Sequence, residues 1–65
     1  MTLPIRLDTF LKLSSVVQTG GHAKMIIQGG KVMVDGEVET RRGRKLRGGE
    51  SVKVSGKTLT VPPAT

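Results

Sequence analysis

Glycine-containing turn signals divide the second half of the chain into short segments, and they constrain its fold more than any other feature. They stand at Gly29-Gly30, Asp35-Gly36, Gly48-Gly49 and Ser55-Gly56. Glycine accepts positive φ angles that other residues avoid, so these pairs favour helix ends and tight turns. Between them, apolar and polar residues alternate, which is typical of half-buried strands. We therefore expect a small antiparallel sheet here rather than a long helix.

The first two of these strands form a predicted hairpin around Asp35-Gly36. A two-residue turn would pair Val34 with Glu37 and place two glutamates on the face of the valines. We expect instead a longer or bulged turn that pairs Val34 with Val38, because this register gives a cleaner apolar face. The predicted strands cover residues 31–34, 37–40, 52–54 and 57–61.

Two short helices are predicted in the first half of the chain. Asp8 can act as the N-cap of a helix over about residues 8–16. Thr19 can cap a second helix of about two turns, which Gly29 and Gly30 end. Their apolar faces comprise Leu7, Phe10 and Leu11 in the first helix and Ala23, Ile26 and Ile27 in the second. Because such short helices need a surface to pack on, the predicted fold is α+β, with two helices on a small antiparallel β-sheet.

The length of 65 residues predicts one domain, residues 1–65, with a core over about residues 5–61. Residues 1–6 form an extended lead-in, and residues 62–65 a loose tail. The chain has no cysteine, which excludes a disulfide framework or thiolate metal site and fits a reducing cytoplasm. No apolar run approaches the ~18 residues of a membrane span. A single histidine without an imidazole or thiolate partner predicts neither catalysis nor a metal or cofactor site.

The charge balance predicts attraction to polyanions. Eleven Lys and Arg residues against five Asp and Glu give a net charge of +6. Residues 41–47, called the basic segment below, contain no acid and carry Arg41, Arg42, Arg44, Lys45 and Arg47 in a loop-like run. Phosphate contact is the functional interpretation, and a solvated loop is the alternative. The only aromatic residue, Phe10, is expected in the core, so base stacking on aromatics is excluded.

The order of these parts resembles the RNA-binding domain named after ribosomal small-subunit protein S-four. The resemblance rests on Arg6-Leu7-Asp8-Thr9-Phe10-Leu11-Lys12, Gly20-Gly21-His22-Ala23-Lys24, Ile27-Gln28-Gly29-Gly30-Lys31-Val32-Met33-Val34-Asp35-Gly36 and Gly49-Glu50. The Gly-Gly-x-Ala-Lys piece and the basic segment resemble a subgroup of small stand-alone bacterial members. The resemblance implies helices forming an L (the alpha-L motif) and binding of structured RNA, often ribosomal or transfer RNA. Where many members carry Ser-Arg, this chain has Gly20-Gly21-His22, so one family arginine contact is missing.

The candidate RNA contacts combine the charge argument with the resemblance. They are Arg6, Lys12, Gly20, Gly21, His22, Lys24, Arg41, Arg42, Arg44, Lys45 and Arg47. The start of the second helix can hold a phosphate on its backbone N–H groups, although its glycines can equally serve the loop. For Arg6, a salt bridge with Asp8 is the alternative. Glu37 and Glu39 are expected to be exposed charges on a strand edge.

These observations predict a non-catalytic, cytoplasmic RNA-binding protein that uses phosphate and shape contacts. A monomer is expected, although exposed strand edges could pair. Its partners would be a structured RNA and possibly the ribosome or an RNA-modifying protein. The alternative is a protein-docking module in such a complex. A duplex DNA binder is a less favoured alternative: the net charge does not exclude it, but no helix carries base-reading residues in series. A membrane-active peptide would need a long amphipathic helix.

Overall fold

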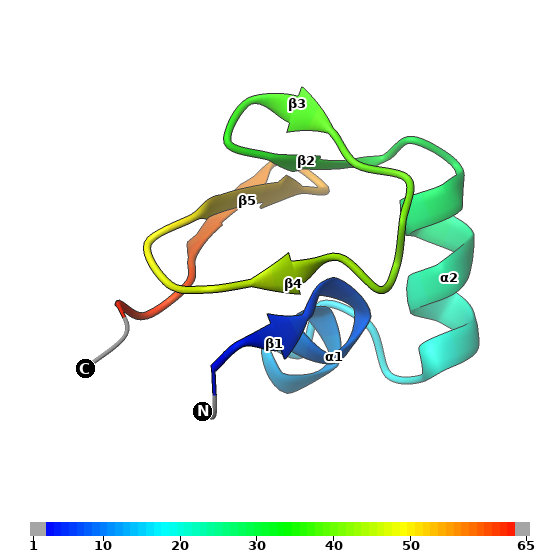
Figure 1. Cartoon of the computed structure of the whole chain (residues 1–65). Coiled ribbons are helices and arrows are strands. Elements are labelled where there is room, and N and C mark those ends of the chain that lie inside the picture. The colour runs from blue at the N-terminus through cyan, green and yellow to red at the C-terminus, as the bar shows by residue number, and fades with distance from the viewer. Residues whose placement is uncertain (1–2, 64–65) are drawn as a thin grey trace.

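Two helices stand against a small antiparallel sheet in a computed structural model that describes residues 3–63 (Figure 1). Figure 1 shows α1 almost end-on and α2 along its length, so the two helices form an L. This confirms the predicted α+β fold. The elements are β1 (Ile5–Arg6), α1 (Leu7–Leu13), α2 (Gly20–Gln28), β2 (Val32–Val34), β3 (Glu37–Val38), β4 (Lys45–Leu46), β5 (Ser51–Val54) and β6 (Lys57–Thr60). Over the described residues, neither helix has the length and apolar content needed to cross a bilayer.

Helix α1 begins and ends earlier than predicted, and the prediction of Asp8 as its N-cap is wrong. Arg6 occupies the N-cap position, and its side chain makes no capping hydrogen bond. The Asp8 carboxylate does accept from a first-turn N–H, that of Thr9 at 2.8 Å, but from within the helix. The N–H of Leu7 donates to the carbonyl of Arg44 at 2.8 Å, and that of Asp8 to the carbonyl of Arg42 at 3.1 Å. Backbone carbonyls from the basic segment therefore satisfy the first two free donors of the helix, which a capping side chain would otherwise do.

Helix α2 follows the prediction at both ends. The Thr19 side chain accepts a hydrogen bond from the N–H of His22 at 3.1 Å, so the predicted N-cap is confirmed. The chain leaves α2 through Gly30 at φ 76°, and it leaves α1 through Ser15 at φ 61°. Both residues take the left-handed conformation that ends helices. The buried residues of the two helices are Leu7, Phe10 and Leu11 in α1 and Ala23 and Ile27 in α2.

The strands form two separate sheets, and the smaller one is a single ladder of two strands. The larger sheet has the order β3-β2-β5-β6, and β1 pairs with β4 in the smaller one. In the smaller ladder, Ile5 lies opposite Leu46 and Arg6 opposite Lys45. Two residues of the basic segment, which was predicted to be a loop throughout, therefore form a strand. This ladder fixes the segment to the start of α1.

The hairpin register differs from the prediction. Asp35 and Gly36, at φ 53° and 84°, form a two-residue turn that pairs Val34 with Glu37 rather than with Val38. Positive φ at both central positions is the geometry that matches the twist of the flanking strands. Val38 consequently stays on the outer face, 57% exposed, and the next residue turns inward. This register places a glutamate, Glu39, on the core side, where ion pairs with two arginines stabilise it.

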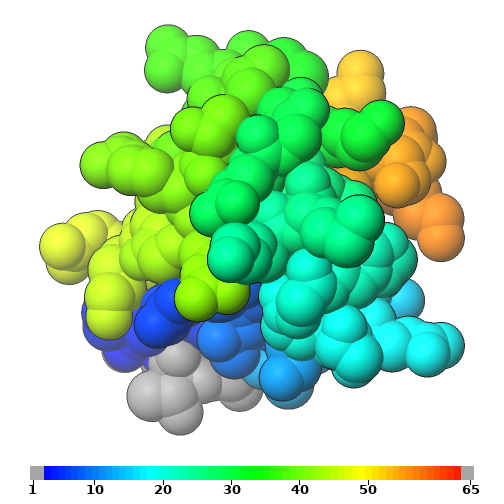
Figure 2. All heavy atoms as spheres, turned by 90° about the vertical axis from the view of Figure 1, so that its right-hand side faces the viewer, coloured from blue at the N-terminus to red at the C-terminus, as the bar shows by residue number. Residues whose placement is uncertain are grey.

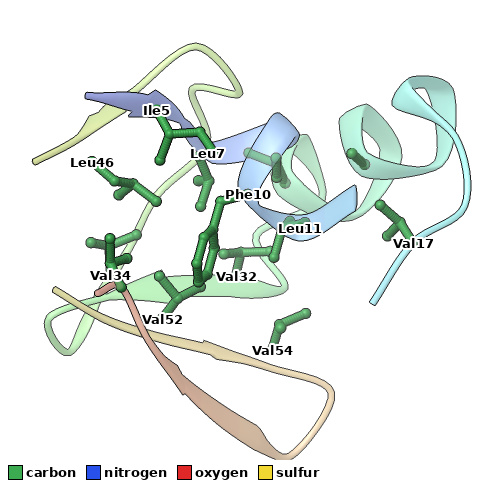
Figure 3. Packing of buried hydrophobic residues seen from close by; sticks show 13 residues of the cluster. Ile5, Leu7, Phe10, Leu11, Val17, Val32, Val34, Leu46, Val52 and Val54 are labelled. Carbon is green, nitrogen blue, oxygen red and sulfur yellow. The ribbon is translucent and has the colours of Figure 1, made fainter. Parts of the chain in front are cut away.

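The core lies between the helices and the larger sheet. Figure 3 shows the Phe10 ring among residues of α1 and the valines of the sheet. Val32, Val34, Val52 and Val54 supply the buried face of β2 and β5, as the alternation predicted. The core continues to Val61, which is fully buried after the end of β6. Residues 1–2 of the predicted lead-in and 64–65 of the predicted tail lie outside the described residues.

Candidate nucleic-acid interface

The basic segment is held in place by its own backbone. Besides the carbonyls that receive the first N–H groups of α1, the N–H of Arg44 donates to the carbonyl of Arg41 at 3.2 Å and closes a turn. At the other end, the Glu50 carboxylate accepts from the N–H groups of Arg47 and Gly48, both at 2.7 Å. Burial opposes ionisation of Glu50, but these backbone donors outweigh it and lower its pKa. The segment is therefore an ordered structure and not a free loop.

Glu39 is buried, so the prediction of an exposed charge at this position is wrong. It is only 7% exposed, whereas Glu37 is exposed as predicted. Its carboxylate accepts hydrogen bonds from the N–H of Arg41 at 3.1 Å, from Arg41 Nε at 3.3 Å and from Arg44 Nη1 at 3.1 Å. The side-chain bond from Arg41, with help from its N–H and from Arg44 and against the effect of burial, lowers the pKa of Glu39 from 4.5 to about 2. Two charges of the basic segment are thus paired internally.

The remaining cations of the basic segment face solvent. Arg42, Lys45 and Arg47 are exposed. Among residues 3–63, no carboxylate forms an ion pair with their side chains. Unpaired, exposed guanidinium and ammonium groups are free to meet phosphate oxygens.

Arg6 joins these cations from the smaller ladder. It lies opposite Lys45, and its guanidinium is close to Gly43, where an added Cβ would lie 3.8 Å from Nη2. Arg6 also donates through Nε and Nη2 to the two carboxylate oxygens of Asp8, each at 3.2 Å. The salt bridge that was the alternative interpretation is therefore present. It occupies the Nε and Nη2 edge of the guanidinium. Arg6 and Lys45, which carry like charges, lie opposite each other across the ladder, and this is unfavourable unless an anion lies nearby; Asp8 supplies one to Arg6.

The start of α2 forms a second part of the same face. Figure 2 shows this face, with α2 in cyan to teal beside the yellow-green residues that lead into the basic segment. Gly21, His22 and Lys24 are exposed, and a side chain on Gly20 would meet nothing within 4 Å. Within the described part of the chain, no hydrogen bond or ion pair joins these residues or the Lys12 side chain to the basic segment.

The acids near this face are engaged in the fold. Asp8 binds Arg6, Glu39 binds two arginines, and Glu50 binds backbone N–H groups. Over residues 3–63, no three or more His, Cys, Asp or Glu side chains come together in a group that could hold a metal ion. The face consequently presents mainly donors and positive charge. An Arg or Lys side chain on this face can therefore bind an anion without competition from a free carboxylate.

Curated relatives match over most of the chain. A protein of Bacillus subtilis named "Probable ribosome maturation protein RlbA" is 43% identical over 63 alignment positions, and the match covers 86% of this chain and 89% of the relative. A protein of Escherichia coli named "Putative RNA-binding protein YbcJ" is 39% identical over 57 residues, which cover 88% and 81%.

The fold also matches a solved structure. The trimeric structure of Vibrio cholerae Heat Shock Protein 15 superposes with a TM-score of 0.81 at 20% identity, over 95% of this chain and 66% of that one. At that identity the likeness concerns the fold alone. The S4 domain family matches residues 2–62, nearly the whole length. With the family's motifs in order along the sequence and its two-helix fold in the structure, this chain belongs to the S4 domain family.

Proposed function

We propose that this chain is a non-catalytic RNA-binding protein that grips structured RNA through its phosphates. The observation that carries this proposal is the gathering of Arg6, Arg42, Lys45 and Arg47 on a surface whose neighbouring acids are already engaged. Each cation that neutralises a phosphate releases counterions and adds affinity. Further contacts are proposed from the family resemblance and the positive charge: Lys12, Arg41, Arg44 and the start of α2, residues 20–24.

The surface has cations to bind phosphates but no exposed aromatic residue to stack on bases, and this decides the mode of recognition. The one aromatic residue, Phe10, is buried in the core, so bases cannot stack on it. The A-form major groove is too deep and narrow for side-chain readout, so proteins recognise RNA helices by backbone and shape. An ordered basic surface suits that mode. The geometry of the RNA backbone, more than its base sequence, should then decide what binds.

The class of RNA is inferred from the relatives. One is named a probable ribosome maturation protein and the other a putative RNA-binding protein. The first name favours a ribosomal RNA target and an encounter with the ribosome. A transfer RNA target or an RNA-modifying protein as partner is inferred from the family resemblance alone. The proposal includes a monomer acting in the cytoplasm as one domain over residues 1–65, without a cofactor.

A competition titration tests the function. A labelled RNA hairpin is bound to the protein at several salt concentrations, and three unlabelled competitors are compared: the same hairpin, the same sequence as duplex DNA, and an unstructured single strand. We expect the hairpin to compete best and log affinity to fall linearly with log salt. Equal competition by all three would contradict recognition of structured RNA. In that case, protein partners that survive ribonuclease treatment would favour the docking module.

A further inference from the structure

Glu39 is buried beside the basic segment, and its role in linking that segment to the hairpin through Arg44 accounts for only one of its two arginine partners. It is the one charged residue that is buried among residues 3–63. A buried carboxylate is costly unless it is paired and hydrogen-bonded. An apolar residue of similar size would suit the core side of the hairpin at no such cost. The carboxylate instead lies next to the basic segment and binds two of its arginines.

The two arginines are held in different ways. Arg44 donates one Nη1 bond to Glu39, and only 32% of its side chain is exposed. Arg41 binds Glu39 through Nε at 3.3 Å and more weakly through Nη2 at 3.5 Å, while 79% of its side chain remains exposed. A guanidinium carries five N–H donors in a rigid fork. Arg41 therefore has one edge on the carboxylate and its Nη1 edge toward solvent.

We propose that Glu39 is a positioning residue for RNA binding, which holds Arg41 by one edge so that the other edge is presented to a phosphate. Arg44 acts as the inner anchor of the same carboxylate. This inference rests on the proposed RNA-binding function and assigns a role within it to an acid that simple charge arguments would count as unfavourable.

The energetic advantage is preorganisation. A free arginine loses side-chain entropy when it is fixed against a ligand, and a side chain already fixed in the unbound protein avoids that loss. The pairing leaves a planar fork whose direction is set before RNA arrives. Because the N–H groups of α1 fix the backbone of residues 42 and 44, the fork is also fixed relative to Arg6 and Lys45. Phosphates at the spacing of a structured RNA would benefit more than those of a flexible strand.

Positioning and simple electrostatics predict opposite outcomes when Glu39 is neutralised. Glu39→Gln raises the net charge by one, so charge alone predicts tighter RNA binding. Positioning predicts weaker binding to the hairpin. Glu37→Gln is the matched control, because it makes the same charge change two residues away at an exposed acid that forms no ion pair among the described residues.

The experiment measures hairpin and single-strand affinity for the wild type and both variants. It is done at a temperature where circular dichroism shows each protein folded. We expect Glu37→Gln to bind the hairpin as tightly as the wild type or slightly better. Glu39→Gln should bind the hairpin about threefold to tenfold more weakly than the control, which is the loss expected when one or two side chains are no longer held in place. Its preference for the hairpin over the single strand should also be smaller. Equal hairpin affinity of the two folded variants would overturn the proposal.

A second pair of variants applies if Glu39→Gln does not fold. Arg41→Lys keeps the positive charge and does not alter the ion pair between Arg44 and Glu39. It removes the guanidinium group, which could bind Glu39 with one edge and a phosphate with the other. Arg42→Lys makes the same chemical change at an arginine without a carboxylate partner among the described residues. We expect Arg41→Lys to lose more hairpin affinity, whereas equal losses would overturn the proposal. Wild-type protein that binds all polyanions alike would overturn the proposed function itself, and this inference with it.

Discussion

Arg44 Nη1 donates to Glu39 Oε1 at 3.1 Å and joins the basic segment to the hairpin. The bond spans five residues of sequence, but its strength depends on the larger fold. Glu39 is turned inward by the two-residue hairpin turn, and the backbone of Arg44 is fixed by the N–H of Leu7. Because both partners are largely withdrawn from water, the pair is less screened than an ion pair on the surface.

Arg44→Ala should therefore destabilise the fold more than Arg42→Ala. Loss of Arg44 leaves Glu39 with one partner, and a partly compensated buried charge is expected to cost about 1–3 kcal/mol. Arg42 is exposed and unpaired among residues 3–63, so its replacement should change stability by no more than about 0.5 kcal/mol. Urea unfolding followed by circular dichroism measures both. Equal stability of the two variants would show that the ion pair contributes little.

The lowered pKa of Glu39 predicts loss of stability in acid. Because folding lowers this pKa from 4.5 to about 2, the ionised carboxylate stabilises the folded state fully above pH 4.5. That contribution is lost as the pH falls from 4.5 to about 2. The lowered pKa of Glu50 acts in the same direction, so part of the acid sensitivity should remain when Glu39 is replaced.

Unfolding free energies measured from neutral pH down to about pH 2 test this. Glu39→Gln should lose less stability on acidification than the wild type, while being less stable at neutral pH. Glu37→Gln, the exposed control, should keep the slope of the wild type. A Glu39→Gln profile parallel to that of the wild type would mean that other groups cause the acid sensitivity.

The glycines predict a second contrast in stability. Gly36 has φ 84° in the hairpin turn, a conformation that other residues adopt at a cost. Gly43 lacks a positive φ, and a Cβ there would meet Arg6 at an ordinary 3.8 Å. Gly36→Ala should destabilise by about 1 kcal/mol, whereas Gly43→Ala should be neutral or slightly stabilising. Thermal unfolding measures this, and an equal effect at both positions would argue against the two-residue turn.

What could be predicted from the sequence was local. The cap at Thr19, the end of α2 at Gly30 and the alternating valines depend on neighbouring residues and were predicted correctly. The error at the start of α1 concerns partners that are distant in the chain. The N–H of Asp8 is satisfied by the carbonyl of Arg42, which no local pattern reveals.

The hairpin register failed for a related reason. The register that pairs Val34 with Val38 was predicted because it gives a cleaner apolar face, and no ion pair was expected to compensate a glutamate on the core side. The spacing of Glu39, Arg41 and Arg44 was visible in the sequence. Only the fold shows that the last two turn back onto the first. The list of basic residues was thus predictable, but their division into paired and unpaired cations was not.

The unpaired cations lead to the most direct test of the interface. Lys45 is exposed on β4 opposite Arg6, and Lys57 is exposed on β6, at the far edge of the larger sheet. Replacing either lysine by alanine removes one charge from the same small protein, so long-range attraction changes equally. Only Lys45 lies in the proposed phosphate-binding surface. Lys45→Ala should therefore weaken hairpin binding and reduce the slope of log affinity against log salt by about 1. Lys57→Ala should leave that slope unchanged, and equal slopes for the two variants would mean that the phosphates are bound elsewhere.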